Sequence, residues 1–171
     1  MILHPTPANA FIAGYKALLL EIADPRSTQE STDTLSYLAS ARRQLSEKPA
    51  LLDDALTRVN ARSQRLNDEV VRAVRTLQVN NWVFLRDTKA YSIFVHPTGD
   101  SALGVLGLTD PVRDIVGTTG VIIETGVVLF SRKFVCDGIV TRVVHLGPNY
   151  RKSFNRAYRT AKAEGRFHVD A

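Results

Sequence analysis

The spacing of apolar residues changes once along the chain, near Asn80 and Asn81, and this change limits the possible folds more than any other feature. Before it, apolar residues recur every three or four positions, which is typical of amphipathic helices. After it, short apolar runs are separated by glycine-containing turns, which is typical of strands. We therefore predict an α+β protein in which a helical segment, residues 1–79, shares one core with a sheet subdomain, residues 80–171.

The first two predicted helices are bounded by proline and by capping residues. The first begins at Pro7, because proline favours the first helical position after an N-cap such as Thr6. It ends at Asp24, because a residue that precedes proline is pushed out of the helical region. The second helix begins near residues 31–32, and Pro49 either ends it or begins the next helix.

The third predicted helix, residues 50–77, has the most regular pattern in the chain. Its apolar positions alternate spacings of four and three, which is the pattern of a heptad seam. The residues of this association seam are Leu52, Leu56, Val59, Leu66, Val70 and Leu77. Two interpretations stay open: the helix packs on the two helices before it, or the seam joins two copies of the chain as a coiled coil. Acidic residues near the seam offset its arginines, which argues against DNA binding there.

The second half of the chain predicts a small, mostly antiparallel sheet of five or six strands, or a partial barrel. Candidate strands are residues 82–85, 91–95, 103–108, 121–124, 127–130, 134–136 and 139–146. Asp110-Pro111 is typical of the start of a short helix between two of them. Asp137-Gly138 lies between two apolar runs, which is typical of a two-residue hairpin turn.

That hairpin register also tests a catalytic interpretation of the single cysteine. Cys136 would pair with Ile139, and His145 would lie six residues farther along the strand. At 3.3–3.4 Å per residue the thiol and the imidazole would be roughly 20 Å apart, so we do not expect a thiol-protease pair.

The last predicted helix, near residues 149–165, separates two kinds of side chain. Residues placed on one arc, which we expect to pack on the sheet, are Tyr150, Phe154, Ala157, Tyr158 and Ala161. The opposite arc carries Arg151, Lys152, Arg156, Arg159 and Lys162. Because the rings are expected to be buried, this pattern favours attraction to a phosphate backbone over stacking on bases. An ordinary solvated face, an acidic protein partner or an anionic membrane surface also fits it.

The charge distribution supports an anion-binding function for the C-terminal region. The net charge of the chain is +5. Within residues 146–171, six Lys and Arg face only two Asp and Glu, so most of the excess lies there.

Several protein classes are excluded by what the sequence lacks. A single cysteine excludes a disulfide scaffold. The glycines at 117 and 120 flank no lysine and lead into a strand, so they do not predict a phosphate loop. The four histidines are dispersed, so we expect no metal site and no cofactor. No apolar run approaches the roughly 20 residues of a transmembrane span, and the first residues lack a basic leader region, so we expect a cytoplasmic location.

Three functional hypotheses follow. The leading one is a non-enzymatic binding or assembly protein whose partner is another protein or a second copy of this chain, bound through the association seam. The alternative is nucleic-acid binding through the basic face of the last helix. The third is an enzyme acting on a small molecule, with His96 or His145 as the candidate general base. The sequence does not assign either histidine, or any other residue, to catalysis.

Overall fold

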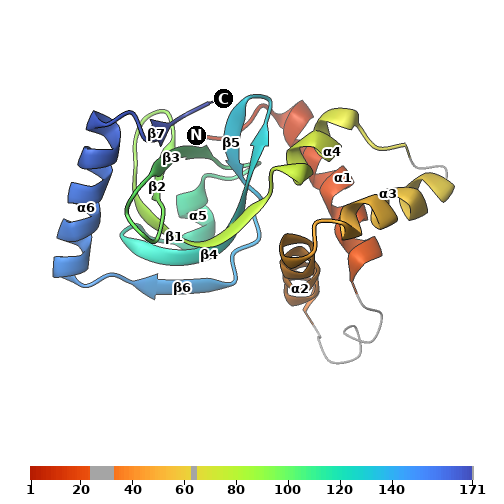
Figure 1. The fold of residues 1–171 in the computed structure, drawn as a ribbon, viewed down its shortest axis with the longest axis horizontal. Helices are drawn as coiled ribbons and strands as arrows, with labels where there is room; N and C mark the ends of the chain where they lie inside the picture. Colours follow the sequence, from red (N-terminus) through yellow and green to blue (C-terminus); the bar gives the residue numbers. More distant parts are fainter. Residues whose placement is uncertain (24–32, 63–64, 171) are drawn as a thin grey trace.

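The computed structural model describes residues 1–23, 33–62 and 65–170. The α+β class is confirmed: in these residues four helices form one side of the molecule, and a small barrel flanked by a further long helix forms the other (Figure 1). The predicted end of the first helix at Asp24 and the start of the second at residues 31–32 lie outside the described residues.

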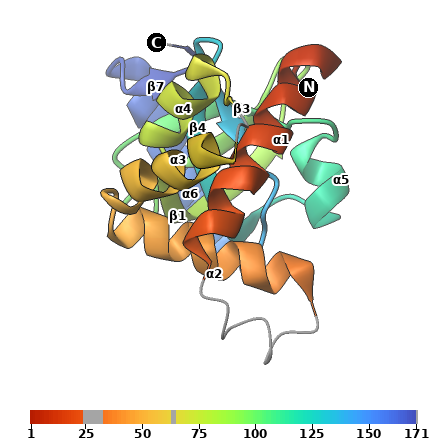
Figure 2. The ribbon, with the colours of Figure 1, turned by 90° about the vertical axis from the view of Figure 1, so that its right-hand side faces the viewer.

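The N-terminal helices pack around α1. Their bounds are α1 Pro5–Ile22, α2 Thr34–Glu47, α3 Leu51–Ala61 and α4 Asp68–Arg75. Helix α1 begins two residues earlier than predicted, because Pro5 rather than Pro7 takes the first helical position. Figure 2 shows α1 lying across α3 and α4, and its residues Phe11, Leu18 and Leu19 are buried there.

The single long helix predicted for residues 50–77 is wrong. Helix α3 ends at Ala61, and a second helix, α4, starts after Asn67. The side chain of Asn67 caps α4 by accepting a hydrogen bond from the backbone N–H of Glu69 at 2.8 Å. The break separates the two halves of the apolar pattern, so each half can pack on α1 separately.

The strands form a small barrel. The sequence pattern alone left a sheet and a partial barrel open. Their bounds are β1 Gln78–Asp87, β2 Ser92–Val95, β3 Ala102–Leu106, β4 Val121–Phe130, β5 Lys133–Cys136, β6 Arg142–His145 and β7 Phe167–His168. The order β1-β2-β3-β5-β4 closes on itself because β4 also pairs with β1. The pairings of β3 with β5 and with β7 are parallel, and the others are antiparallel.

The predicted Asp137-Gly138 hairpin is also wrong. The tight turn lies instead at Ser131 and Arg132, which both have positive φ and connect β4 to β5. Strands β5 and β6 do not pair with each other; both pair with β4, one after the other. Residues 137–141 therefore bulge out of one interrupted strand. The sequence hides the true turn, because neither Ser131 nor Arg132 is a residue typical of positive φ.

In the middle of β1, side chains on both faces of the strand are buried. Trp82 and Phe84 of β1 point into the barrel, where Val112 of helix α5, Val112–Val116, joins them. Val83 and Leu85 point outward and pack beneath helix α6, Pro148–Ala163. This double burial explains why residues 82–85 in the middle of β1 form an unbroken apolar run rather than an alternating one.

Candidate functional site

Helix α6 is held against the outside of the barrel by a small aromatic cluster. Tyr158 and Ala161 are buried on its inner face. The Tyr158 ring meets the Phe167 ring edge-on, with centroids 5.3 Å apart, and the Arg86 guanidinium lies 5.3 Å from the Tyr158 ring. The helix therefore keeps one fixed face outward, and that face carries its charges.

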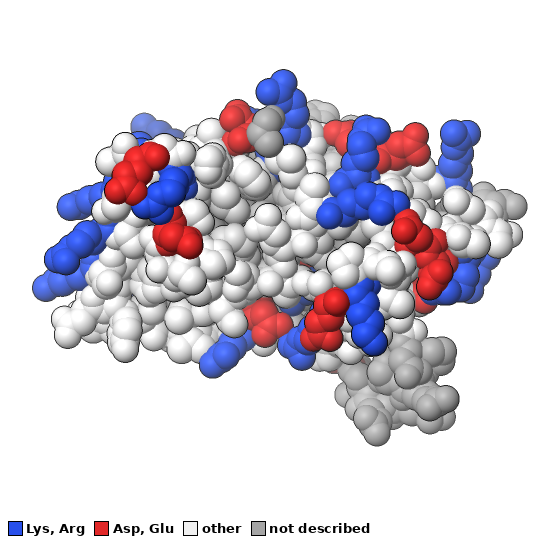
Figure 3. All heavy atoms as spheres, in the orientation of Figure 1, with Lys and Arg blue, Asp and Glu red and all other residues white. Residues whose placement is uncertain are grey.

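The outer face of α6 carries the five cations that the sequence pattern places there. All five side chains are exposed: Arg151, Lys152, Arg156, Arg159 and Lys162. In Figure 3, Lys and Arg atoms protrude along the left edge, which is the side where Figure 1 places α6. From the first of these residues to the last, the helix rises about 17 Å at 1.5 Å per residue.

Within the part of the chain that the structure describes, no acidic side chain neutralises these five cations. Among the described residues, no Asp or Glu carboxylate lies within 4.0 Å of any of the five. In the helical part, by contrast, Arg43 pairs with Glu124 at 2.8 Å and Arg75 pairs with Asp53 at 2.6 Å. The positive potential of α6 is therefore not cancelled locally, and it faces solvent.

Tyr150 departs from its predicted position on the buried arc of α6. Its side chain is 68% exposed, the highest value among the exposed large apolar side chains of the described residues. The arc was assigned correctly for Tyr158 and Ala161, but the packing of α6 against the barrel begins only at Phe154. Tyr150, in the first turn of the helix, is therefore exposed to solvent and directly precedes Arg151 in the chain.

The association seam lies in the interior of the single chain. Leu52, Val59 and Val70 are at most 2% exposed and belong to the core beneath α1. The other seam residues pack partly buried against the same core: Leu56, Leu66 and Leu77. Any coiled coil formed through this seam would have to displace these intramolecular contacts.

Neither histidine considered as a general base is among the residues that line the pocket between α1, α2 and the barrel, which is described below. The Nε2 atom of His96 lies 3.0 Å from Asn80 Nδ2, and its Nδ1 atom lies 2.6 Å from Thr98 Oγ1. His145 is exposed on β6. Both ring nitrogens of His96 therefore have partners that hold the turn after β2.

Cys136 and His145 lie far apart. They are on two strands that both pair with β4, and not on the two strands of the predicted hairpin. Along β4, Cys136 is opposite Val127 and His145 is opposite Val121, six residues away. At 3.3–3.4 Å per residue this separation is again roughly 20 Å. Burial raises the pKa of the Cys136 thiol to about 11, so the sulfur is a protonated core atom at neutral pH.

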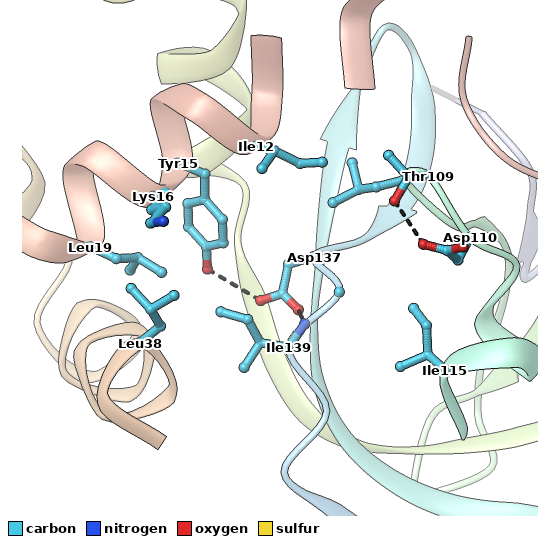
Figure 4. A pocket seen from close by; sticks show the side chains of 12 residues that line it. Ile12, Tyr15, Lys16, Leu19, Leu38, Thr109, Asp110, Ile115, Asp137 and Ile139 are labelled. Carbon is cyan, nitrogen blue, oxygen red and sulfur yellow. Dashed lines mark hydrogen bonds between the residues drawn. The ribbon is translucent and has the colours of Figure 1, made fainter. Parts of the chain in front are cut away.

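A pocket of about 320 Å³ lies where α1 and α2 meet the barrel (Figure 4). Its walls are mainly apolar, and residues lining it include Ile12, Tyr15, Leu38, Ile115, Asp137 and Ile139. Lys16 and Asp110 add opposite charges on two sides of it. Sequence reasoning missed this pocket, because its residues come from four separated parts of the chain.

Asp137 forms one wall of the pocket and joins the helices to the barrel. Arg42 of α2 donates from Nη1 to both carboxylate oxygens at 3.3 Å, and the Tyr15 hydroxyl of α1 donates to Oδ2 at 3.2 Å. Thr125 of β4 donates to Oδ1 at 3.1 Å. Burial raises the pKa of Asp137, and the Arg42 guanidinium opposes that shift. Burial and the neighbouring Asp137 also raise the pKa of Tyr15.

The described residues include no group of three His, Cys, Asp or Glu side chains that could hold a metal ion. In the same residues, no helix is long and apolar enough to cross a membrane. Comparison with protein-family models, with curated proteins and with solved structures gives no match for this chain.

Proposed function

We propose that this protein binds nucleic acid by its phosphate backbone, through the outer face of α6. The observation that carries the proposal is the row of five exposed cations without acidic partners among the described residues. Each cation that neutralises a phosphate releases condensed counterions, and this release provides affinity without base contacts. The spacing of the cations along about 17 Å of helix suits a polymer better than a single small anion.

The topology of the barrel supports the proposal by analogy. Five-stranded Greek-key barrels of the OB type bind oligonucleotides over the face of their second and third strands. Here α6 lies over the corresponding face, above Ile93, Val95 and Ala102. The basic outer surface of α6 would then take the place of the covered barrel face. The analogy concerns fold alone, and the charges of α6 carry the functional argument.

Binding is tested by fluorescence anisotropy of labelled oligonucleotides over a series of salt concentrations. For five phosphate contacts the slope of log K against log salt should be about −3.5 for a single strand and about −4.5 for a duplex. The double variant Arg156→Glu/Arg159→Glu should abolish binding while the protein stays folded.

A matched control separates a local site from a general effect of net charge. Arg65 and Arg72 are exposed; Arg72 lies on α4 and Arg65 three residues before that helix. Figure 1 shows α4 on the other side of the barrel from α6, so Arg65→Glu/Arg72→Glu makes the same change of charge away from α6. The control should retain most of the affinity. Equal losses in both double variants, or no binding by the unmodified protein at low salt, would contradict the proposal. If the α6 variant loses binding to an acidic protein, but neither variant changes binding to nucleic acid, a protein partner is favoured instead.

The pocket between the helices and the barrel supports a second candidate function, which is binding of a small molecule with an apolar body. Its volume of about 320 Å³ and its mainly apolar walls with few polar groups are typical of ligand sites. A library of small molecules should contain some that raise the Tm of the protein. Ile115 is 41% exposed at this pocket, so Ile115→Trp should block it and remove those shifts without unfolding the protein.

A further inference from the structure

We propose that the nucleic acid bound along α6 is single-stranded, and that one of its bases stacks on the ring of Tyr150. This inference rests on the function proposed above and adds the class of nucleic acid that the same surface selects.

The first observation is that the Tyr150 ring has no structural use within the fold. It is 68% exposed. Among the described residues it has no ring contact and no hydrogen bond, whereas Tyr91 and Tyr158 both pack on Phe167. An aromatic ring in water forgoes the stabilisation that burial would provide, so an unused ring calls for an explanation outside the core.

The second observation is the neighbourhood of the ring. Tyr150 directly precedes Arg151 and Lys152, and it follows β6, whose residues are all exposed. Val143 and Val144 of β6 are 44% and 39% exposed. Figure 1 shows β6 running directly into the first turn of α6. Apolar surface, an aromatic ring and cations therefore adjoin one another at this end of the helix.

The third observation concerns how firmly the adjacent cation is placed. A Cβ built on Gly120 would lie 2.6 Å from the Nε atom of Arg151, so this guanidinium lies directly on the Gly120 backbone. Gly120 also accepts a hydrogen bond from the backbone N–H of Leu146 at 3.1 Å, which fixes the chain just before the helix. A phosphate held by Arg151 in this position would lie close to Gly120 and to the start of the helix that carries Tyr150.

These three features together select a single strand. In a duplex the base faces are already stacked on one another, and a flat exterior ring meets only backbone and groove edges. In a single strand the base faces are free, and a ring flanked by cations can stack on one base while the cations hold the neighbouring phosphates. The cations alone would bind either form, so discrimination between the two depends on Tyr150.

The experiment uses probes with equal numbers of phosphates: a thymine-containing single strand, the same strand with abasic sites throughout, and a duplex. The single strand is prepared as DNA and, with uracil, as RNA, and the tighter of the two identifies the preferred backbone. The unmodified protein should bind the intact strand about five-fold or more tightly than the abasic strand or the duplex, as expected for one stacked base.

Variants then assign the preference to the ring. Tyr150→Ala should reduce affinity for the intact strand to that for the abasic strand, and leave the abasic strand unaffected. Tyr150→Phe should retain the preference. Lys152→Ala should weaken all probes by a similar factor, because it removes a phosphate contact only. Circular dichroism and the Tm confirm that each variant is folded.

The possible failures are distinguishable. Equal affinity of the unmodified protein for intact and abasic strands, or an unchanged affinity in Tyr150→Ala, would overturn stacking and leave phosphate binding standing. A duplex bound as tightly as the single strand would overturn the single-strand preference. Absence of salt-sensitive binding to every probe would overturn the proposed function itself.

Discussion

The guanidinium of Arg42 lies 3.3 Å from both carboxylate oxygens of Asp137, and neither side chain is exposed to solvent. The two residues belong to different parts of the molecule, since Arg42 is on α2 and Asp137 follows β5. Removing one member leaves the other as a buried charge without its main partner. Removing one member of a buried ion pair destabilises a protein by far more than the intact pair stabilises it.

We therefore expect Arg42→Met to lower the free energy of unfolding by about 3–5 kcal/mol. Replacing both residues, as Arg42→Met/Asp137→Leu, should recover a substantial part of that loss, because no buried charge remains. Urea denaturation followed by circular dichroism measures both values. A loss below about 1 kcal/mol in the single variant would contradict a central role of this pair.

The buried carboxylate also requires a glycine opposite it. A Cβ on Gly126 would lie 2.3 Å from Asp137 Oδ2, well inside contact distance. Gly126→Ala should therefore displace the carboxylate and destabilise the protein by about 3 kcal/mol. Gly147→Ala serves as the control, since a Cβ there meets nothing within 4 Å and its φ is −65°. Gly147 is the N-cap of α6, so this change should cost no more than about 1 kcal/mol. Thermal denaturation should show a large loss of Tm for the first variant and little change for the second.

The thiol of Cys136 should be inert in the folded protein. Burial raises its pKa to about 11, so almost no thiolate exists at pH 8, and the sulfur is inaccessible to reagents. A chromogenic disulfide reagent should react with one thiol per chain in guanidinium chloride, and only at the rate of unfolding in native buffer. Rapid reaction of the native protein would show that the barrel interior opens easily.

The ion pair of Glu124 with Arg43 predicts a pH dependence of stability. The hydrogen bond from Arg43 lowers the pKa of Glu124 below its ordinary value. The stabilisation is therefore present above that value and disappears as the pH falls through the lowered pKa. Since Arg43 is largely exposed, Glu124→Gln should cost about 0.5 kcal/mol at pH 7. The difference from the unmodified protein should shrink as the pH falls through the lowered pKa of Glu124 and vanish below it, as measured by urea denaturation at each pH.

Secondary-structure features that depend on neighbours within a few positions could be predicted from the sequence alone. The change from helix to strand, a strand close to residues 91–95 and the C-terminal helix all follow local periodicity and are present in the structure. The first strand begins at Gln78, two residues before the predicted change at Asn80. The shared outer face of Arg151, Arg156 and Arg159 follows from the same 100° rotation per residue.

Features that depend on residues distant in sequence became visible only in the three-dimensional structure. The heptad seam does not reveal a break near Arg62, because the core beneath α1 buries either half equally well. The dipeptide Asp137-Gly138 is typical of a hairpin turn. In the structure it lies in a bulge, because the Asp137 carboxylate is buried against the Arg42 guanidinium and occupies the space next to Gly126. Tyr150 lies on the apolar arc of α6, yet its exposure depends on where the barrel ends beneath the helix. Local pattern assigns a residue to a face, and only the packing partners in three dimensions decide whether that face is covered.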